Sequence, residues 1–254
     1  MADRRPEPGV PPQIIPRPPS ARPGTGAPWT HLDPADRQGL TLGRVLDDLA
    51  LAGRLGPAPD PLAAPFVELW DTLVPVDRAA LAAVLVALFE EHGETRVVLT
   101  RRSDRLRSHR GEVSFPGGRA EPGEEAPAAA IRESVEEVAL DPAAVTVVGW
   151  LSPVLTVASG SLIAPVVATL PGRPVLVANP AEVARVFDVA LADLLADGVF
   201  SEELWSVPGP PGQPSPGVRP IWFFEAAGEM IWGATARILV DLLAVACGVE
   251  VPLD

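Results

Sequence analysis

The 254-residue chain predicts an α+β fold. Short runs rich in Val and Ile, typical of strands, occur among longer stretches whose apolar residues recur at helical spacing. The two kinds of segment do not alternate strictly, which argues against a doubly wound parallel sheet. The length allows one substantial hydrophobic core with extensions.

The N-terminal third predicts an arm and a short helical extension. Residues 1–38 are rich in proline and lack periodicity, which predicts a disordered or loosely draped arm. Residues 39–75 form the extension, in which 41–55 has apolar residues at helical spacing and Thr41 as a candidate N-cap. The main domain is expected over 76–250.

The main domain contains both kinds of element. A tight turn is expected between its first two strands, and Pro127 is compatible with a helix only in the first turn. In chain order, we expect strands over 82–91 and 96–102, a helix over 125–139, strands within 145–156 and 162–170, a helical segment following Asn179 within 179–197, a Pro/Gly-rich loop over 207–220, a strand over 221–225 and a helix over 233–247.

Composition restricts the class of partner. The net charge of −13 and the pI near 4.7 argue against a broad basic surface for nucleic acid, so no nucleic-acid partner is expected. A small phosphorylated substrate remains compatible, because a bound metal can reverse the local sign of charge.

The sequence also predicts a cytoplasmic protein. The N-terminus lacks the apolar core of a secretory signal, and no run reaches the roughly 18 apolar residues of a membrane helix. The single cysteine, Cys247, excludes an internal disulfide and is interpreted as a small buried hydrophobe. The oligomeric state is open, and a homodimer is compatible with the sequence.

The expected helix over 125–139 carries clustered acids. At about 100° per residue, three carboxylates fall on one side and three β-branched side chains on the other. We therefore expect docking through an Ile/Val stripe and an outward acidic face. The stripe consists of Ile131, Val135 and Val138, and the acidic face of Glu133, Glu136 and Glu137.

Two interpretations of the acidic face are open. Acidic helix faces are commonly just solvated, whereas oxygen-rich clusters also suit hard divalent cations such as Mg²⁺. Gly117 and Gly118 precede the helix, where the backbone can approach a ligand closely.

The spacing of these residues resembles the Nudix box of Nudix hydrolases. From Gly118, five residues lead to Glu124, seven more to Arg132-Glu133, two to Glu136-Glu137 and one to Ala139-Leu140. The family pattern has an apolar residue at the position of Ser134 and glycine at that of Ala139. The resemblance implies a mixed β-sheet flanked by helices, an α/β/α sandwich.

The resemblance also implies the site and its cofactor. Mg²⁺ or Mn²⁺ would be bound by Glu133, Glu136 and Glu137, with Glu124 as a further acidic member and the Gly118 carbonyl as an additional ligand. Arg132 would orient the carboxylates within the catalytic set. The general base is left open between Glu133 and a residue from a later loop.

The segment before the box resembles the coenzyme A pyrophosphatase branch of the family. Residues 98–118, "VLTRRSDRLRSHRGEVSFPGG", also gather arginines in an otherwise acidic chain, and guanidinium groups bind phosphate in bidentate fashion. Any one of these arginines could equally form ion pairs with the acidic surface or structural hydrogen bonds. The substrate-binding candidates are Arg102, Arg107, His109 and Gly117, and Glu182 is a candidate extra carboxylate.

The function expected from the resemblance is metal-dependent hydrolysis of the diphosphate of coenzyme A or acyl-CoA. The products would be 4'-phosphopantetheine, or its acyl form, and adenosine 3',5'-bisphosphate. Two alternatives stay open: hydrolysis of another nucleoside diphosphate derivative or nucleotide, and a non-catalytic Nudix fold acting as a ligand sensor.

Overall fold

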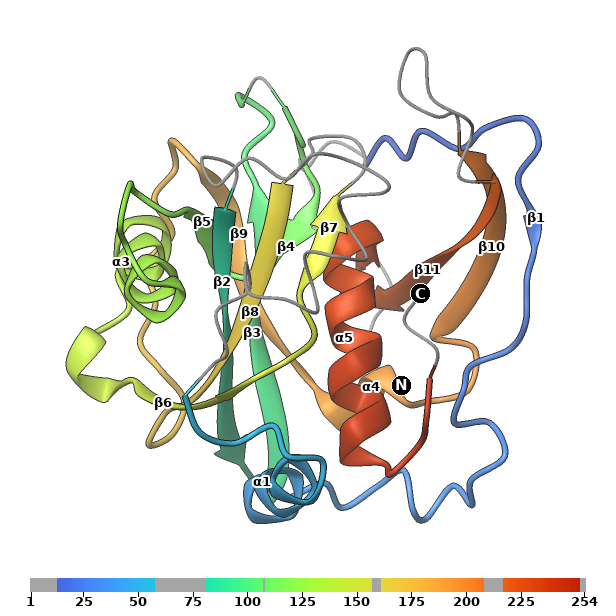
Figure 1. Cartoon of the computed structure of the whole chain (residues 1–254), viewed down its shortest axis with the longest axis horizontal. Helices are drawn as coiled ribbons and strands as arrows, with labels where there is room; N and C mark the ends of the chain where they lie inside the picture. Colours follow the sequence, from blue (N-terminus) through green and yellow to red (C-terminus); the bar gives the residue numbers. More distant parts are fainter. Residues whose placement is uncertain (1–12, 58–80, 107, 157–160, 208–216, 252–254) are drawn as a thin grey trace.

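A computed structural model describes residues 13–57, 81–106, 108–156, 161–207 and 217–251 (Figure 1). The start of the main domain near residue 76 and the distal part of the extension lie outside these ranges. The elements in chain order are β1 (Arg22–Pro23), α1 (Leu42–Leu51), β2 (Leu81–Glu91), β3 (Glu94–Arg102), β4 (Val113–Ser114), β5 (Gly117–Arg119), α3 (Ala126–Val138), the 3₁₀ turn η2 (Pro142–Ala144), β6 (Thr146–Trp150), β7 (Val154–Thr156), β8 (Ser161–Thr169), β9 (Val183–Ala190), α4 (Leu191–Leu194), β10 (Phe200–Val207), β11 (Gly217–Ala226), β12 (Glu229–Trp232) and α5 (Gly233–Ala246).

A mixed sheet forms the centre of the domain. Its path is β4-β3-β2-β8-β6, with β5 paired to β2, β7 to β8 and β9 to β3. β2 and β8 run parallel, whereas the hairpin β2–β3 and the other pairs are antiparallel. Helix α3 covers one face and α5 the other, so the expected α+β class with a helix-flanked mixed sheet is confirmed (Figure 1).

Strand β2 supplies a hydrophobic layer to each face of this sheet. Successive side chains of a strand point to opposite faces. Leu85 and Phe89 belong to the core that includes α3, while Val86 and Leu88 belong to the core that includes α5. The continuous apolar run over 81–89 is therefore that of a strand buried on both sides.

A second sheet packs beside α5 and was missed by the sequence analysis. Within the described residues its order is β1-β10-β11-β12, all antiparallel. Both ends of the Pro/Gly-rich loop expected over 207–220 belong to strands: Val207 ends β10, and 217–220 are part of β11 and pair with β10. Residues 208–216 lie outside the described residues.

The segment expected to turn helical after Asn179 is mainly a strand. β9 pairs antiparallel with β3 from Arg96↔Ala190 to Arg102↔Val183, and only the short helix α4 follows. The physical reason is tertiary: β3 offers an open edge to "VARVFDVA", whose Val and Phe content suits a strand.

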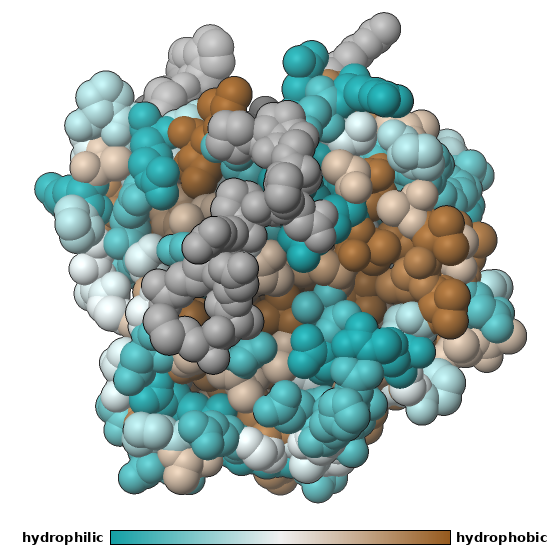
Figure 2. Space-filling model, turned by 180° about the vertical axis from the view of Figure 1, so that it is seen from behind, coloured by the Kyte–Doolittle hydropathy of each residue, from teal (hydrophilic) through white to brown (hydrophobic). Residues whose placement is uncertain are grey.

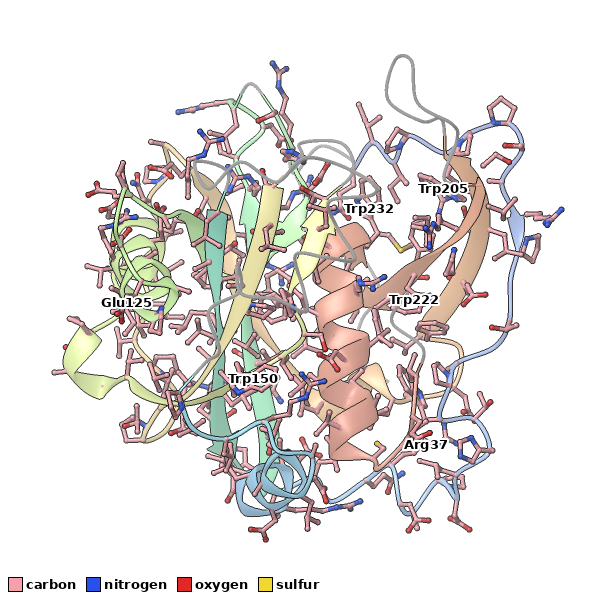
Figure 3. All side chains as sticks on the ribbon, in the orientation of Figure 1. Arg37, Glu125, Trp150, Trp205, Trp222 and Trp232 are labelled. Carbon is pink, nitrogen blue, oxygen red and sulfur yellow. The ribbon has the colours of Figure 1, made fainter. Side chains whose placement is uncertain are left out.

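Residues 13–38, expected to be a disordered or loosely draped arm, bury Trp29 and Arg37 against the domain; residues 1–12 lie outside the described part. Trp29 is 1% exposed, with its ring 5.4 Å from Phe200 and 6.1 Å from Phe224. Arg37, also buried, donates to the Leu195 carbonyl and to Asp197 (Figure 3). The Trp29 ring packs against the second sheet, and Arg37 bonds to the turn that follows α4, so both side chains attach the N-terminal segment to the domain.

The surface is polar with interspersed hydrophobic areas (Figure 2). Val175 and Val177 are 89% and 64% exposed. None of the helices in the described ranges combines the length and the apolar character needed to cross a membrane.

Candidate active site

Helix α3 follows directly from local sequence. Alanines favour the helix, and Pro127 lies in its first turn, where its missing N–H is no loss. The helix ends at Ala139, which adopts the left-handed conformation with φ 53° and ψ 34°. The residue that replaces the glycine of the box thus takes the backbone conformation in which glycine is favoured.

The face through which α3 docks differs from the expectation. Val135 is 39% exposed and Ile131 only half-buried, whereas Glu137 is 2% exposed. The docking face is rotated by about 100° from the expected Ile/Val stripe. Small side chains on this face let the helix approach β2 closely. The buried Ser134 hydroxyl donates to the Ala130 carbonyl at 2.7 Å, so it has a hydrogen-bond partner inside the core. The buried residues are Ala126, Ala129, Ala130, Ser134, Glu137 and Val138.

Arg132 organises the acids at the start of the site. Its Nε and Nη2 donate to the two Glu124 oxygens, both at 2.9 Å, and its Nη1 donates to Glu133 at 2.8 Å. Glu136 is farther away at 3.5 Å and half exposed. The Arg132 bonds hold the pKa of Glu124 below its ordinary value. Arg132 therefore orients Glu124 and Glu133 through charge-assisted hydrogen bonds.

Glu137 is the buried carboxylate of the site. Burial raises its pKa to about 7; the Gly117 N–H, which donates at 3.1 Å, and Arg102 oppose that rise, while Glu133 and Glu182 add to it. The Nη1 of Arg102 lies 3.5 Å from Glu137 Oε1. Like charges near a buried carboxylate are typical of functional sites.

Two glycines place the loop against these acids. Gly117 has φ +152°, and a Cβ on it would lie 2.3 Å from the Ala83 carbonyl oxygen. A Cβ on Gly118 would lie 2.4 Å from Glu133 Oε2. Only glycine allows β5 to pair with β2 at the first position, whereas at the second position a Cβ would force the Glu133 carboxylate to move.

The turn at 179–183 brings Glu182 to the same region. The Asn179 N–H donates to the Glu137 carbonyl at 2.8 Å, and the Glu182 carbonyl accepts from Ser103 N–H at 2.8 Å. This turn therefore connects the end of α3 with the end of β3. Sequence reasoning missed Asn179, although the Asn-Pro pair signalled a turn.

The arginine-rich segment is only partly assembled at the site. Arg102 faces Glu137, and its buried Nε has no hydrogen-bond partner within the described residues. His109 is half exposed, and its Nδ1 lies 2.9 Å from a Glu112 carboxylate oxygen. Arg107 lies outside the described residues. Arg101 is buried against Glu229 at 2.8 Å.

The donor set fits a hard divalent cation. Glu133 and Glu137 lie close enough for one to raise the pKa of the other, and a cation between them would relieve that repulsion. Over the ranges that the structure describes, no three His, Cys, Asp or Glu side chains are already gathered as a metal cluster. Glu124 is turned toward Arg132 instead of toward Glu137.

Comparison with known proteins gives consistent matches. A family model described as "NUDIX domain" matches residues 79–204. "Uncharacterized Nudix hydrolase NudL" from Photorhabdus laumondii is 39% identical over 167 residues, which are 65% of this chain and 84% of that protein. "Nudix hydrolase 22, chloroplastic" from Arabidopsis thaliana is 39% identical over 179 residues, which are 67% of this chain and 57% of that longer protein. A solved structure, the M. smegmatis Nudix hydrolase RenU, is 22% identical with a TM-score of 0.39 and covers 44% of this chain and 71% of that one.

Proposed function

The chain belongs to the Nudix hydrolase family, and we propose that its substrate is coenzyme A or an acyl-CoA. As a member of this family it is a pyrophosphohydrolase of nucleoside diphosphate derivatives. The observation that carries the proposal is Arg102, a guanidinium beside the buried Glu137 at the end of the arginine-rich segment. Hydrolysis of the diphosphate would release 4'-phosphopantetheine, or its acyl form, and adenosine 3',5'-bisphosphate.

Arg102 supports a phosphate-rich substrate. Its Nη1 is held only loosely by Glu137 at 3.5 Å, and its Nε has no hydrogen-bond partner in the described part of the chain. A buried donor without a partner is costly, and a phosphate oxygen would satisfy it. Arg102 is thus free to bind the diphosphate while Glu137 stays in place through the Gly117 N–H.

Nudix hydrolases use divalent metal ions, and the acids of α3 would hold them here. Glu133, Glu136 and Glu137 are the proposed ligands of Mg²⁺ or Mn²⁺, with the Gly118 carbonyl as an additional ligand. The bound ion would supply charge withdrawal from the diphosphate oxygens. Arg132 fixes the side chain of Glu133, and the Gly117 N–H fixes that of Glu137.

The remaining chemistry is proton and charge transfer. Water attacks one phosphorus, its proton passes to a carboxylate, and the bond from that phosphorus to the bridging oxygen breaks, so that the other half of the substrate leaves as a phosphate monoester. Glu133 and Glu182 are the carboxylates proposed to take the proton, while Glu137, which accepts from the Gly117 N–H, is kept as a metal ligand.

Product analysis tests the proposal. Purified protein with Mg²⁺ is incubated separately with coenzyme A, NADH, ADP-ribose and nucleoside triphosphates, and the products are identified by mass. We expect the highest kcat/KM for coenzyme A or an acyl-CoA, with the two products named above. Hydrolysis of ADP-ribose or NADH at a higher kcat/KM would contradict the substrate assignment.

A pair of variants tests the catalytic assignment. Glu137→Gln removes a ligand charge and should reduce kcat at least about 100-fold. Glu125→Gln is the matched control, because Glu125 is exposed at the start of the same helix and makes no side-chain capping bond (Figure 3). Unchanged turnover in Glu137→Gln would show that the assignment is wrong.

A further inference from the structure

The Gln13 side chain joins the N-terminal segment to two distant parts of the domain. Its amide Nε2 donates to the Gly111 carbonyl and to the Met230 carbonyl, both at 2.9 Å. Its Oε1 accepts from the Met230 N–H at 2.7 Å. One amide group thus makes three hydrogen bonds, using both of its donor hydrogens.

The bonds to Met230 are those of a neighbouring strand. β12 is the edge of the second sheet, and an edge strand presents the N–H and C=O of alternate residues together on its open side. The Gln13 amide occupies both groups of Met230 at once. Glu229, the neighbour of Met230 in β12, forms a buried ion pair with Arg101 of β3 at 2.8 Å. Gln13 is therefore attached to a strand that is itself anchored to the central sheet.

The bond to Gly111 reaches the proposed substrate segment. Gly111 N–H donates to the Arg102 carbonyl at 3.2 Å, and Arg102 N–H donates to the Glu112 carbonyl at 2.9 Å. Gly111 has φ +66°, and a Cβ on it would lie 3.0 Å from Asp104 Oδ1 and 3.2 Å from Arg101 Nη2, so glycine suits this position. Gly111 and Glu112 are therefore hydrogen-bonded to the backbone of Arg102, which also pairs with Val183 of β9, and the guanidinium of Arg102 lies beside Glu137.

We propose that Gln13 is a positioning residue that fixes the substrate-binding segment, and with it Arg102, by clamping Gly111 to β12. The inference rests on the proposed function, in which Arg102 binds the diphosphate. It gives the N-terminal segment a role in substrate affinity that its proline-rich composition does not suggest. A primary amide of this length is required, because a carboxylate cannot donate to the two carbonyls.

Kinetics of the full-length protein test the clamp. Gln13→Glu and Gln13→Ala should raise KM for coenzyme A about 5- to 10-fold and leave kcat within about twofold. The neighbouring Ile14→Ala is the matched control, because Ile14 is 87% exposed, and it should behave as the unmodified protein. An unchanged KM in both Gln13 variants would overturn the proposal, and so would a fall in kcat together with a lowered melting temperature.

Hydrogen exchange tests the clamp without substrate. In Gln13→Glu, the amides of Arg102 and Gly111 should exchange at least about threefold faster, while those of β2 and α3 are unchanged. Equal exchange rates of the Arg102 and Gly111 amides in the unmodified protein and in Gln13→Glu would overturn the inference. If the unmodified protein fails to hydrolyse coenzyme A while exchange changes as expected, the proposed substrate is wrong and the clamp stands.

Discussion

The Arg132 guanidinium forms two parallel hydrogen bonds, both 2.9 Å long, with the two oxygens of Glu124. The same group donates to Glu133, on the next residue of α3. Arg132 is anchored to Glu124 in the preceding loop and thereby fixes Glu133, a proposed metal ligand. Because the guanidinium is planar, it holds the two carboxylates in a defined relative orientation.

Replacing Arg132 with Lys should reduce kcat/KM about 10- to 100-fold. An ammonium group cannot bind Glu124 in bidentate fashion and hold Glu133 as well, so Glu133 loses its fixed orientation. Steady-state kinetics at saturating Mg²⁺ measure the effect. Arg119→Lys is the control, because the Arg119 side chain is exposed and only its carbonyl takes part in the network. Equal activity in both variants would contradict an orienting role.

Replacing Ala139 with Gly should stabilise the protein by about 0.5 to 1 kcal/mol. Ala139 is left-handed at the end of α3, a conformation that is unfavourable for a residue with a Cβ. Urea unfolding of the metal-free protein gives the free energy difference. Ala128→Gly, at an exposed position within the same helix, should have the opposite sign. Destabilisation by Ala139→Gly would show that the strain is absent.

Replacing Trp29 with Ala should cost about 3 to 5 kcal/mol of unfolding free energy. The ring is 1% exposed and contacts Phe200 and Phe224, so its removal leaves a cavity between the N-terminal segment and the second sheet. Denaturant unfolding measures the loss. A change below about 1 kcal/mol would mean that the segment is only loosely attached.

Cys247 should react slowly with iodoacetamide up to pH 9. Burial raises the pKa of its thiol to about 11, so at pH 9 about 1% is thiolate, compared with half of a cysteine at the ordinary value of 9. The folded-state pKa is above the unfolded one, so the stability linked to the neutral thiol is present below pH 9 and is lost as pH rises toward 11. Alkylation rates in native and urea-unfolded protein, followed by mass, check this, and equal rates at pH 8 would contradict it.

The sequence predicted the elements with strong local signals. The helix capped by Thr41, the β2–β3 hairpin and the final helix α5 are confirmed, because capping chemistry, a His-Gly turn and apolar periodicity are readable within a short window. The acids of the box could be located by spacing alone, and Arg132 does contact Glu124 and Glu133 as an orienting residue would.

What the sequence could not predict depends on tertiary partners. β9 is a strand because β3 has an open edge, and α3 buries alanines and Glu137 because β2 accepts a close helix. The burial of Glu137 and the attachment of Gln13 to Met230 involve residues far apart in the chain. Such contacts leave no periodic signal.

Strand β2 has a hydrophobic layer on each side and hydrogen-bonded neighbours along both edges. From Leu85 to Phe89 neither face of the strand meets water, so a polar or larger side chain introduced there would have to displace a packed neighbour. Diversification of related enzymes toward new substrates is therefore expected in the connecting segments around the acids, where an exchange of side chains alters recognition and leaves the scaffold intact.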